Sequence, residues 1–275
     1  LCVICFPRKK AMTFATDSYS TAELSARHET LNVKAVVWTA FALRIYEVTM
    51  NKIKLLALDL DGTTLTSKNT LAPAVKSALE KAIENGIIIA IATGRPLGTM
   101  PQSILDIEGI EYLITSNGAA IYDRHGKKIY SATLKENDVL KILDVMKDED
   151  IISEAFVDGL TYTDKRYSDN PLAYGCTEAY IDYVKASHGH IEDMRKFIFE
   201  HKNELDSIEY ISTDPQTKKR IWTMLENAVD NIFITTSSEH FIELMDKSAT
   251  KASALSHLAE MLNIDMQNTC ACGNA

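Results

Sequence analysis

Residues 55–64 read LLALDLDGTT, an apolar run that ends in two aspartates, Asp59 and Asp61, followed by Gly62. The apolar residues do not alternate with polar ones, which is typical of a parallel strand buried on both faces. Side chains two residues apart on an extended chain point the same way, so both carboxylates should address one spot. Gly62 permits a tight turn that exposes main-chain N–H groups. Two acids beside free amides favour a hard cation and a phosphate.

Other motifs that bind ions or nucleotides do not match this stretch. An EF-hand loop starting at Asp59 would need glycine at its sixth position and an acid at its twelfth. Those positions hold Thr64 and Thr70. The Walker-A and dinucleotide-binding glycine patterns are absent. The plain alternative is a strand that ends in a polar turn with two solvated acids.

Strands and helices alternate after this run. Residues 72–85 show the apolar spacing of an amphipathic helix, with Pro73 suited to its first turn and Gly86 to its end. The apolar runs 87–92 and 112–115 predict two more strands. This β-α-β order indicates an α/β fold with a Rossmann-like parallel-sheet core.

After residue 123 the regular β-α-β pattern of the sequence gives way to mixed helical and strand patterns, which indicates an inserted domain. Residues 124–127 suggest a hairpin turn, and helical patterns recur near 138–146, 191–205 and 217–229, with short β-rich pieces 207–212 and 232–236 between them. We therefore expect an α+β cap domain at 134–237 within a core made of 50–133 and 238–275. The core should resume with a strand at 241–244, a helix at 251–262 and a strand at 269–272.

The first 49 residues lack a clean strand or helix pattern. We interpret residues 1–49 as an upstream or non-native extension, with Met50 as the natural start. The alternative is a genuine extension that holds one amphipathic helix near residues 22–35.

Composition limits the function classes. The chain has 275 residues and a formal net charge of −9, which argues against nucleic acid as a partner. No apolar stretch reaches the length of about 20 residues that spans a membrane. Five cysteines, an odd number, favour a reducing, cytoplasmic location. Cys2-x-x-Cys5 is at most half of a zinc site, and we do not expect a cysteine-bound metal.

Three further signals follow predicted strands or begin a helix. In Thr93-Gly94-Arg95, a hydroxyl and a guanidinium are suited to phosphate oxygens. In Ser116-Asn117-Gly118, Asn117 is suited to orienting a ligand, although a plain Asn-Gly turn explains it equally well. Lys251 starts a predicted helix, where a cation opposes the helix dipole and an anionic neighbour would offset this.

Together these motifs resemble the haloacid dehalogenase superfamily, in particular its Cof-type phosphatase branch. The matching positions are the Asp-x-Asp-Gly-Thr strand end at 59–63, Thr-Gly-Arg at 93–95, Asn-Gly at 117–118 and the lysine at 251. The resemblance covers residues 50–275.

The resemblance implies Mg²⁺-dependent hydrolysis of small phosphate monoesters, such as sugar phosphates or phosphorylated cofactors, through a phosphoaspartate. It assigns the nucleophile to Asp59, the acid and base to Asp61, and the phosphoryl-holding groups to Thr93 and Lys251. Substrate contacts are assigned to Gly62, Thr63, Gly94, Arg95 and Asn117. Mg²⁺ would be held by Asp59, the carbonyl of Asp61 and Asn274.

The end of the chain departs from the family pattern. Asn274 stands where the family has its first metal-binding acid, and the second acid would lie beyond Ala275. From this we expect a truncated fragment with weak or absent activity. Two alternatives stay open: a sugar phosphomutase with the same nucleophile, and a non-catalytic phosphate-binding module. The sequence does not decide the particular ester or the number of subunits.

Overall fold

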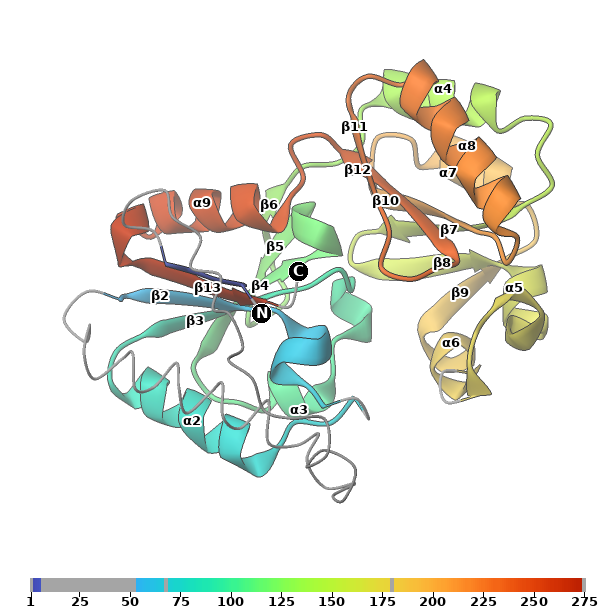
Figure 1. The fold of residues 1–275 in the computed structure, drawn as a ribbon. Coiled ribbons are helices and arrows are strands. Elements are labelled where there is room, and N and C mark those ends of the chain that lie inside the picture. The colour runs from blue at the N-terminus through green and yellow to red at the C-terminus, as the bar shows by residue number, and fades with distance from the viewer. Residues whose placement is uncertain (1, 6–52, 67–68, 179–180, 274–275) are drawn as a thin grey trace, which may run out of the picture. The chain divides into compact units, whose positions relative to one another are not determined.

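The computed structural model describes residues 2–5, 53–66, 69–178 and 181–273. They form two compact units. The first comprises the described parts of Leu1–Thr93, Pro101–Leu113 and Leu255–Ala275; the second comprises those of Gly94–Met100 and Ile114–Ala254. The elements of both are labelled in Figure 1.

The first unit is built on a largely parallel sheet with strand order β1-β13-β2-β3-β4. Its strands are β1 (Cys2–Cys5), β2 (Leu55–Leu58), β3 (Ile88–Ala92), β4 (Ile110–Thr115) and β13 (Thr269–Gly273). β2 lies between β13 and β3 and pairs with both in parallel. Side chains of its central strands, such as Leu55, Ile89 and Ile91, are fully buried. The predicted α/β class and parallel-sheet core are therefore confirmed.

Two helices cover opposite faces of this sheet, α2 (Pro73–Glu84) and α9 (Lys251–Met261) (Figure 1). α2 begins with Pro73 in its first turn and is followed by Gly86 at φ +80°, as the sequence predicts. The short helix α3 (Gln102–Leu105) completes the unit. The predicted strands at 55–58, 87–92, 112–115 and 269–272 all occur, with ends shifted by a residue or two.

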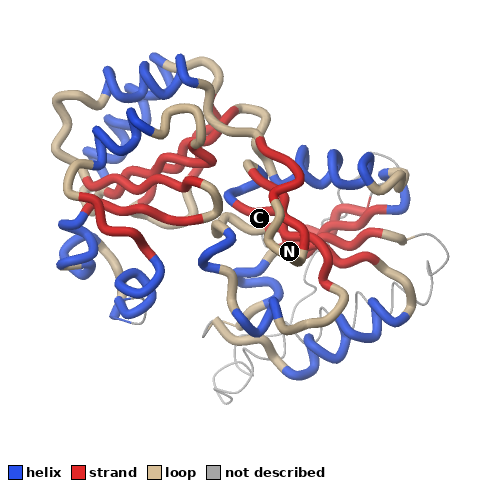
Figure 2. Tube along the Cα trace, turned by 180° about the vertical axis from the view of Figure 1, so that it is seen from behind, coloured by secondary structure: helices blue, strands red, loops and turns tan. Residues whose placement is uncertain are grey.

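The second unit contains a hairpin and a six-stranded sheet, shown in red in Figure 2. The hairpin strands are β5 (Ala120–Asp123) and β6 (Lys128–Ser131). The sheet has the order β11-β12-β10-β7-β8-β9. Its strands are β7 (Ile152–Val157), β8 (Leu160–Asp164), β9 (His188–Ile191), β10 (Leu205–Ile211), β11 (Ile232–Thr235) and β12 (Phe241–Asp246).

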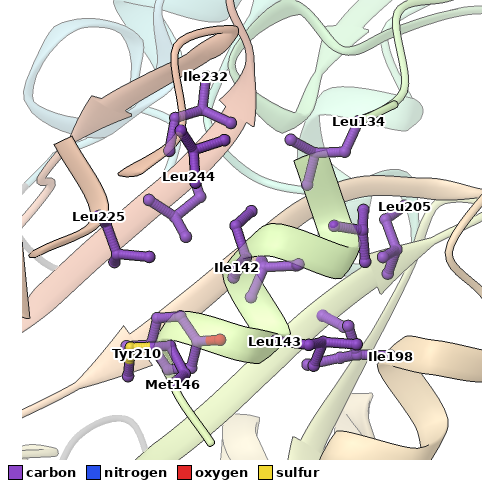
Figure 3. Packing of buried hydrophobic residues seen from close by; sticks show 14 of the residues in the cluster. Leu134, Ile142, Leu143, Met146, Ile198, Leu205, Tyr210, Leu225, Ile232 and Leu244 are labelled. Atoms are coloured by element: carbon purple, nitrogen blue, oxygen red, sulfur yellow. The ribbon is translucent and has the colours of Figure 1, made fainter. Parts of the chain in front are cut away.

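Helices cover this sheet on two sides. They are α4 (Glu136–Val145), α5 (Lys165–Asp169), α6 (Ile181–Ser187), α7 (Met194–Glu200) and α8 (Pro215–Ala228). Residues from α4, α7 and α8 pack on strand residues such as Tyr210 and Leu244 to form one core (Figure 3). Tyr167 of α5 and Val184 of α6 pack with Ile152 and Ile211, whose side chains alternate with those of the core face. Short 3₁₀ turns occur at η2 (Leu97–Thr99), η3 (Ser116–Gly118), η4 (Pro171–Tyr174) and η6 (Met266–Asn268).

The first 49 residues, which lack a clean strand pattern in the sequence, contain the strand β1. β1 pairs antiparallel with β13, with Cys5 opposite Cys270. A run of four residues is too short for periodicity to reveal, and its pairing partner lies at the other end of the chain. The alternative helix at 22–35 falls outside the described residues.

Two later elements also differ from expectation. The helix expected at 191–205 is shorter, because β9 occupies residues up to Ile191 and the Asp193 side chain caps α7 by accepting from Lys196 N. The strand expected to return to the core at 241–244 instead pairs with β10 and β11 in the six-stranded sheet. The domain boundaries expected at 134 and 237 stay a prediction.

Candidate active site

The turn after β2 holds the aspartate pair. Asp59 N donates to Cys272 O at 2.9 Å, which ties Asp59 to the end of β13. Asp59 and Asp61 keep extended backbone, while Leu60 between them is buried. Asp59 is half-buried and Asp61 is exposed.

Gly62 and Thr64 close the turn. Gly62 has φ +71°, a conformation that glycine adopts without strain. Thr64 Oγ1 donates to Asp59 O at 2.6 Å, and Leu65 N donates to Leu60 O at 2.9 Å. The hydroxyl oxygen of Thr63 is buried and has no hydrogen-bond partner among the described residues. A phosphate oxygen would satisfy it, since buried hydroxyls are normally hydrogen-bonded.

Thr93 follows β3 at the same edge of the sheet as Asp59. The register pairs Leu58 with Cys272 on one side and with Ile91 on the other, so three strand ends are aligned. Thr93 is 1% exposed. The carboxyl edge of a parallel sheet is where α/β proteins place ligands. Asp59, Asp61, Gly62, Thr63 and Thr93 thus belong to one edge of the first unit.

The donors at this edge fit Mg²⁺ chemically. Mg²⁺ takes one or two carboxylates and retains several waters, so it does not require a cage of protein ligands. Asp59 and Asp61 supply carboxylate and main-chain oxygens of that kind. No group of three or more histidine, cysteine, aspartate or glutamate side chains suited to a metal occurs within the described ranges. Asn274 lies outside the described residues.

The remaining predicted residues belong to the second unit and centre on the turn Ser116–Gly118. Its three residues have φ values of +49°, +56° and +104°. The Asn117 side chain lies against Gly94, where an added Cβ would be 3.0 Å from Asn117 Oδ1. Asn117 Nδ2 donates to Glu243 Oε2 at 3.0 Å. The side-chain amide of Asn117, one of the predicted substrate-binding residues, therefore already has a hydrogen-bond partner in the protein.

Arg95 is joined to the same turn through its backbone. Ser116 N donates to Arg95 O at 3.0 Å, and Arg95 Nη1 donates to Thr99 O at 3.5 Å. The Arg95 side chain is partly exposed. Its guanidinium carries the N–H donors that suit phosphate oxygens.

Lys251 is the first residue of α9, as predicted. The preceding Thr250 caps the helix: its Oγ1 accepts from Ser253 N at 3.0 Å, and Thr250 N donates to Ser253 Oγ at 3.0 Å. This reciprocal capping fixes where the helix starts, and with it the backbone position of Lys251. Gly118 lies beside this start, because an added Cβ would be 2.8 Å from Lys251 N.

Sequence reasoning missed Glu243. A glutamate between apolar neighbours on β12 reads as a solvent-facing residue, yet Glu243 is 4% exposed. It pairs with Glu209 on β10, which in turn pairs with Glu154 on β7. The signal available in the sequence was a glutamate at the centre of each of three apolar strands, but only strand pairing places the three side by side.

The charge states in this row are set by burial. Burial raises the pKa of Glu209 well above its usual value, with a further contribution from the charge of Glu243. Burial also raises the pKa of Glu154 to about 7. Buried carboxyl groups with raised pKa values favour the neutral form. Glu243, by contrast, accepts hydrogen bonds from Asn117 Nδ2 and Ser237 N.

Across residues 2–5, 53–66, 69–178 and 181–273, no helix is both long and apolar enough to cross a membrane.

Known proteins similar to this chain include named phosphatases. Phosphatase YwpJ of Bacillus subtilis is 30% identical to the chain over 241 residues, covering 81% of the chain and 84% of YwpJ. The 5-amino-6-(5-phospho-D-ribitylamino)uracil phosphatase YwtE of the same organism is 26% identical over 242 residues, covering 81% and 82%.

A solved haloacid dehalogenase-like hydrolase from B. subtilis has the same fold, with a TM-score of 0.67, 28% identity and coverage of 81% of this chain and 84% of that one. The family model for haloacid dehalogenase-like hydrolases matches residues 56–275, which include both aspartates, Thr93 and Lys251. The resemblance seen in the sequence is thereby confirmed, and the chain belongs to the haloacid dehalogenase-like hydrolase family.

Proposed function

We propose that the chain hydrolyses small phosphate monoesters. The observation that carries this is the pair Asp59 and Asp61 at the carboxyl end of a central parallel strand, with Thr93 at the end of the next. Relatives named as phosphatases support the reaction class, and one is named for a phosphorylated ribitylamino-uracil. Sugar phosphates and phosphorylated cofactors or their precursors are therefore the substrates to test, and the reaction belongs in the cytoplasm.

The proposed reaction has two steps. The Asp59 carboxylate attacks phosphorus, the ester P–O bond breaks, and the Asp61 carboxylic acid gives its proton to the leaving alcohol oxygen. The Asp61 carboxylate then takes a proton from a water that attacks the phosphoaspartate, which frees Asp59 and inorganic phosphate. Splitting one displacement into two lowers the barrier of each, and a single carboxyl can act as acid and then as base.

The other site residues neutralise the charge of the phosphoryl group and orient the ester. Thr93 and Lys251 bind the transferring phosphoryl oxygens, and Gly62 and Thr63 offer N–H and O–H donors. Arg95, with Gly94 and Asn117, orients the ester. Positioning and charge neutralisation carry most of the rate in phosphoryl transfer. Mg²⁺, when bound by Asp59, the Asp61 carbonyl and Asn274, would reduce the repulsion between carboxylate and ester. We propose that residues 134–237, whose sheet also contains β12, act as a cap that selects the leaving group, and that the core comprises residues 50–133 and the chain that follows β12.

The test is release of inorganic phosphate from a panel of monoesters with Mg²⁺ present. The panel contains p-nitrophenyl phosphate, hexose and pentose phosphates, phosphorylated cofactors and the phosphoribitylamino-uracil. We expect at most weak turnover of some members, and its loss to background in Asp59→Asn, because the amide is a poor nucleophile.

Asp106→Asn is the matched control, because Asp106 is an exposed acid of the same unit and should leave turnover unchanged. Turnover that persists in Asp59→Asn would rule out the proposed mechanism. Recovery of an isomeric sugar phosphate instead of free phosphate would identify a mutase.

A further inference from the structure

The turn Ser116–Gly118 links three segments of the second unit that carry proposed site residues. Ser116 N donates a hydrogen bond to the carbonyl oxygen of Arg95 at 3.0 Å. Asn117 packs on Gly94, and Gly118 packs on the peptide between Thr250 and Lys251. Movement of this turn would therefore displace Arg95 and Lys251 together.

Glu243 holds the turn from the side of the six-stranded sheet. Its Oε2 accepts from Asn117 Nδ2 at 3.0 Å, and its Oε1 accepts from Ser237 N at 2.6 Å. Both carboxylate oxygens thus have an N–H donor, and the side chain is 4% exposed. A buried carboxylate with two donors has one favoured orientation, since any other would leave donors and charge unpaired.

The neighbouring strand places a second buried acid beside Glu243. Glu209 is its register partner on β10 and is also buried. Burial, with a contribution from the Glu243 charge, raises the pKa of Glu209, which favours its neutral form.

We propose that Glu243 is a positioning residue: it orients Asn117 and, through the 116–118 turn, fixes the segments that carry Arg95 and Lys251. This inference rests on the proposed function, because Arg95 and Lys251 matter for activity only if they bind the phosphoryl group. Glu243 itself need not touch the substrate.

An exchange of partners tests the proposal. Asn117→Asp keeps the size of the side chain and tolerates the left-handed backbone at φ +56°, but replaces the N–H donor with a second carboxylate facing Glu243. Adding Glu243→Gln restores the bond in reverse: the new amide at position 243 donates to the new carboxylate at position 117, while the amide oxygen still accepts from Ser237 N. The double variant therefore retains both hydrogen bonds.

We expect N117D to lower kcat/KM by about tenfold or more, because a buried carboxylate loses its donor and faces a like charge. The N117D/E243Q double variant should recover to within about threefold of E243Q alone. The matched control is N117D/E209Q, which carries the same substitution on the adjacent strand and should show no recovery. Equal activity of N117D with and without E243Q would overturn the proposal.

A measurement independent of turnover separates this proposal from the proposed function. Hydrogen exchange read by mass spectrometry reports on peptides that cover residues 93–97, 115–119 and 249–252. We expect faster exchange in all three in N117D and a return toward wild type in N117D/E243Q. Exchange that changes only near residue 117 would overturn the linkage. Absence of phosphate release by the wild type would refute the proposed function and leave this exchange pattern as the test of Glu243.

Discussion

Three consecutive residues in left-handed conformations, Ser116, Asn117 and Gly118, distinguish the turn after β4. A non-glycine residue there costs about 1–2 kcal/mol, less for asparagine, so the surrounding contacts must maintain the turn. The contacts with Arg95 O, Glu243 and the Thr250–Lys251 peptide provide this. Gly118 is required for two reasons, its φ of +104° and the lack of space for a side chain.

We predict that Gly118→Ala destabilises the protein by at least about 2 kcal/mol more than Gly86→Ala. Both glycines have positive φ, so both variants introduce backbone strain. A methyl group at Gly86 meets nothing within 4 Å, whereas at Gly118 it would overlap the Thr250 carbonyl. Denaturant unfolding of the two variants measures the difference. Equal losses of unfolding free energy in the two variants would show that the close contact between Gly118 and Thr250 does not affect stability.

The six-stranded sheet has one apolar face and one with a row of acids. Ile208 and Leu244 belong to the apolar core, while Glu154, Glu209 and Glu243 point to the other side. His188 on β9 lies beside the row, with Nε2 3.6 Å from Glu154 Oε1. Burial, with the neighbouring His190, lowers the pKa of His188 to about 4. At neutral pH this pair is therefore not a salt bridge between a cation and an anion.

The two groups should affect stability with opposite signs. The folded pKa of Glu154 is about 7 against 4.5, so the native state binds the extra proton and unfolding free energy falls as pH rises through that window. The folded pKa of His188 is about 4 against 6.5, so the unfolded state binds the extra proton and unfolding free energy rises with pH between those values.

Measured against wild type, Glu154→Gln should therefore gain stability as pH rises from 4.5 to 7, and His188→Asn should lose relative stability as pH rises from 4 to 6.5. Denaturant unfolding at a series of pH values checks both slopes. Slopes of the same sign in the two variants would contradict the assigned charge states.

Helix α4 contributes to the apolar core through one face. Leu143 is 6% exposed and belongs to the core cluster, as Figure 3 shows, whereas Leu140 on the same helix is 38% exposed. The same substitution at both positions isolates burial from helix propensity.

We predict that Leu143→Ala lowers the unfolding free energy by about 2–5 kcal/mol through lost contacts and a cavity. Leu140→Ala should cost less than about 1 kcal/mol. Thermal or denaturant unfolding distinguishes them, and similar losses would show that Leu143 lies in a loosely packed region.

At the scale of the whole molecule, a chain with net charge −9 must accept an anionic ester. Local cations have to provide the attraction, since the overall charge opposes it. In the proposed site, Arg95 and Lys251 of the second unit would supply two such charges, and Mg²⁺ at Asp59 and Asp61 would supply the charge in the first.

We predict that EDTA abolishes phosphate release and that Mg²⁺ restores it. Mg²⁺ should also raise the melting temperature of the wild type, because a ligand that binds only the native state stabilises it. Asp59→Asn should reduce that rise, whereas Asp106→Asn should not. A melting temperature that Mg²⁺ leaves unchanged in the wild type would argue against the metal site.

The sequence by itself determined the parallel core and the motif positions. Strands β2 and β3, helix α2, the start of α9 and the aspartate pair after β2 all follow from local signals: continuous apolar runs, a 3.6-residue period, Pro73, Gly86 and the turn at Gly62. Each of these depends on neighbours within a few residues, which is why they could be predicted.

Only the tertiary structure decided which strands pair and what is buried between them. The pairing of β1 with β13, the place of β12 beside β10, and the contact between Asn117 and Glu243 join residues far apart in the chain. Alternation along β12 shows that Glu243 leaves the apolar core, but not that α5 and α6 cover the other face of that sheet. Whether a carboxylate faces water or an amide is a property of its partners in space, and no local pattern specifies them.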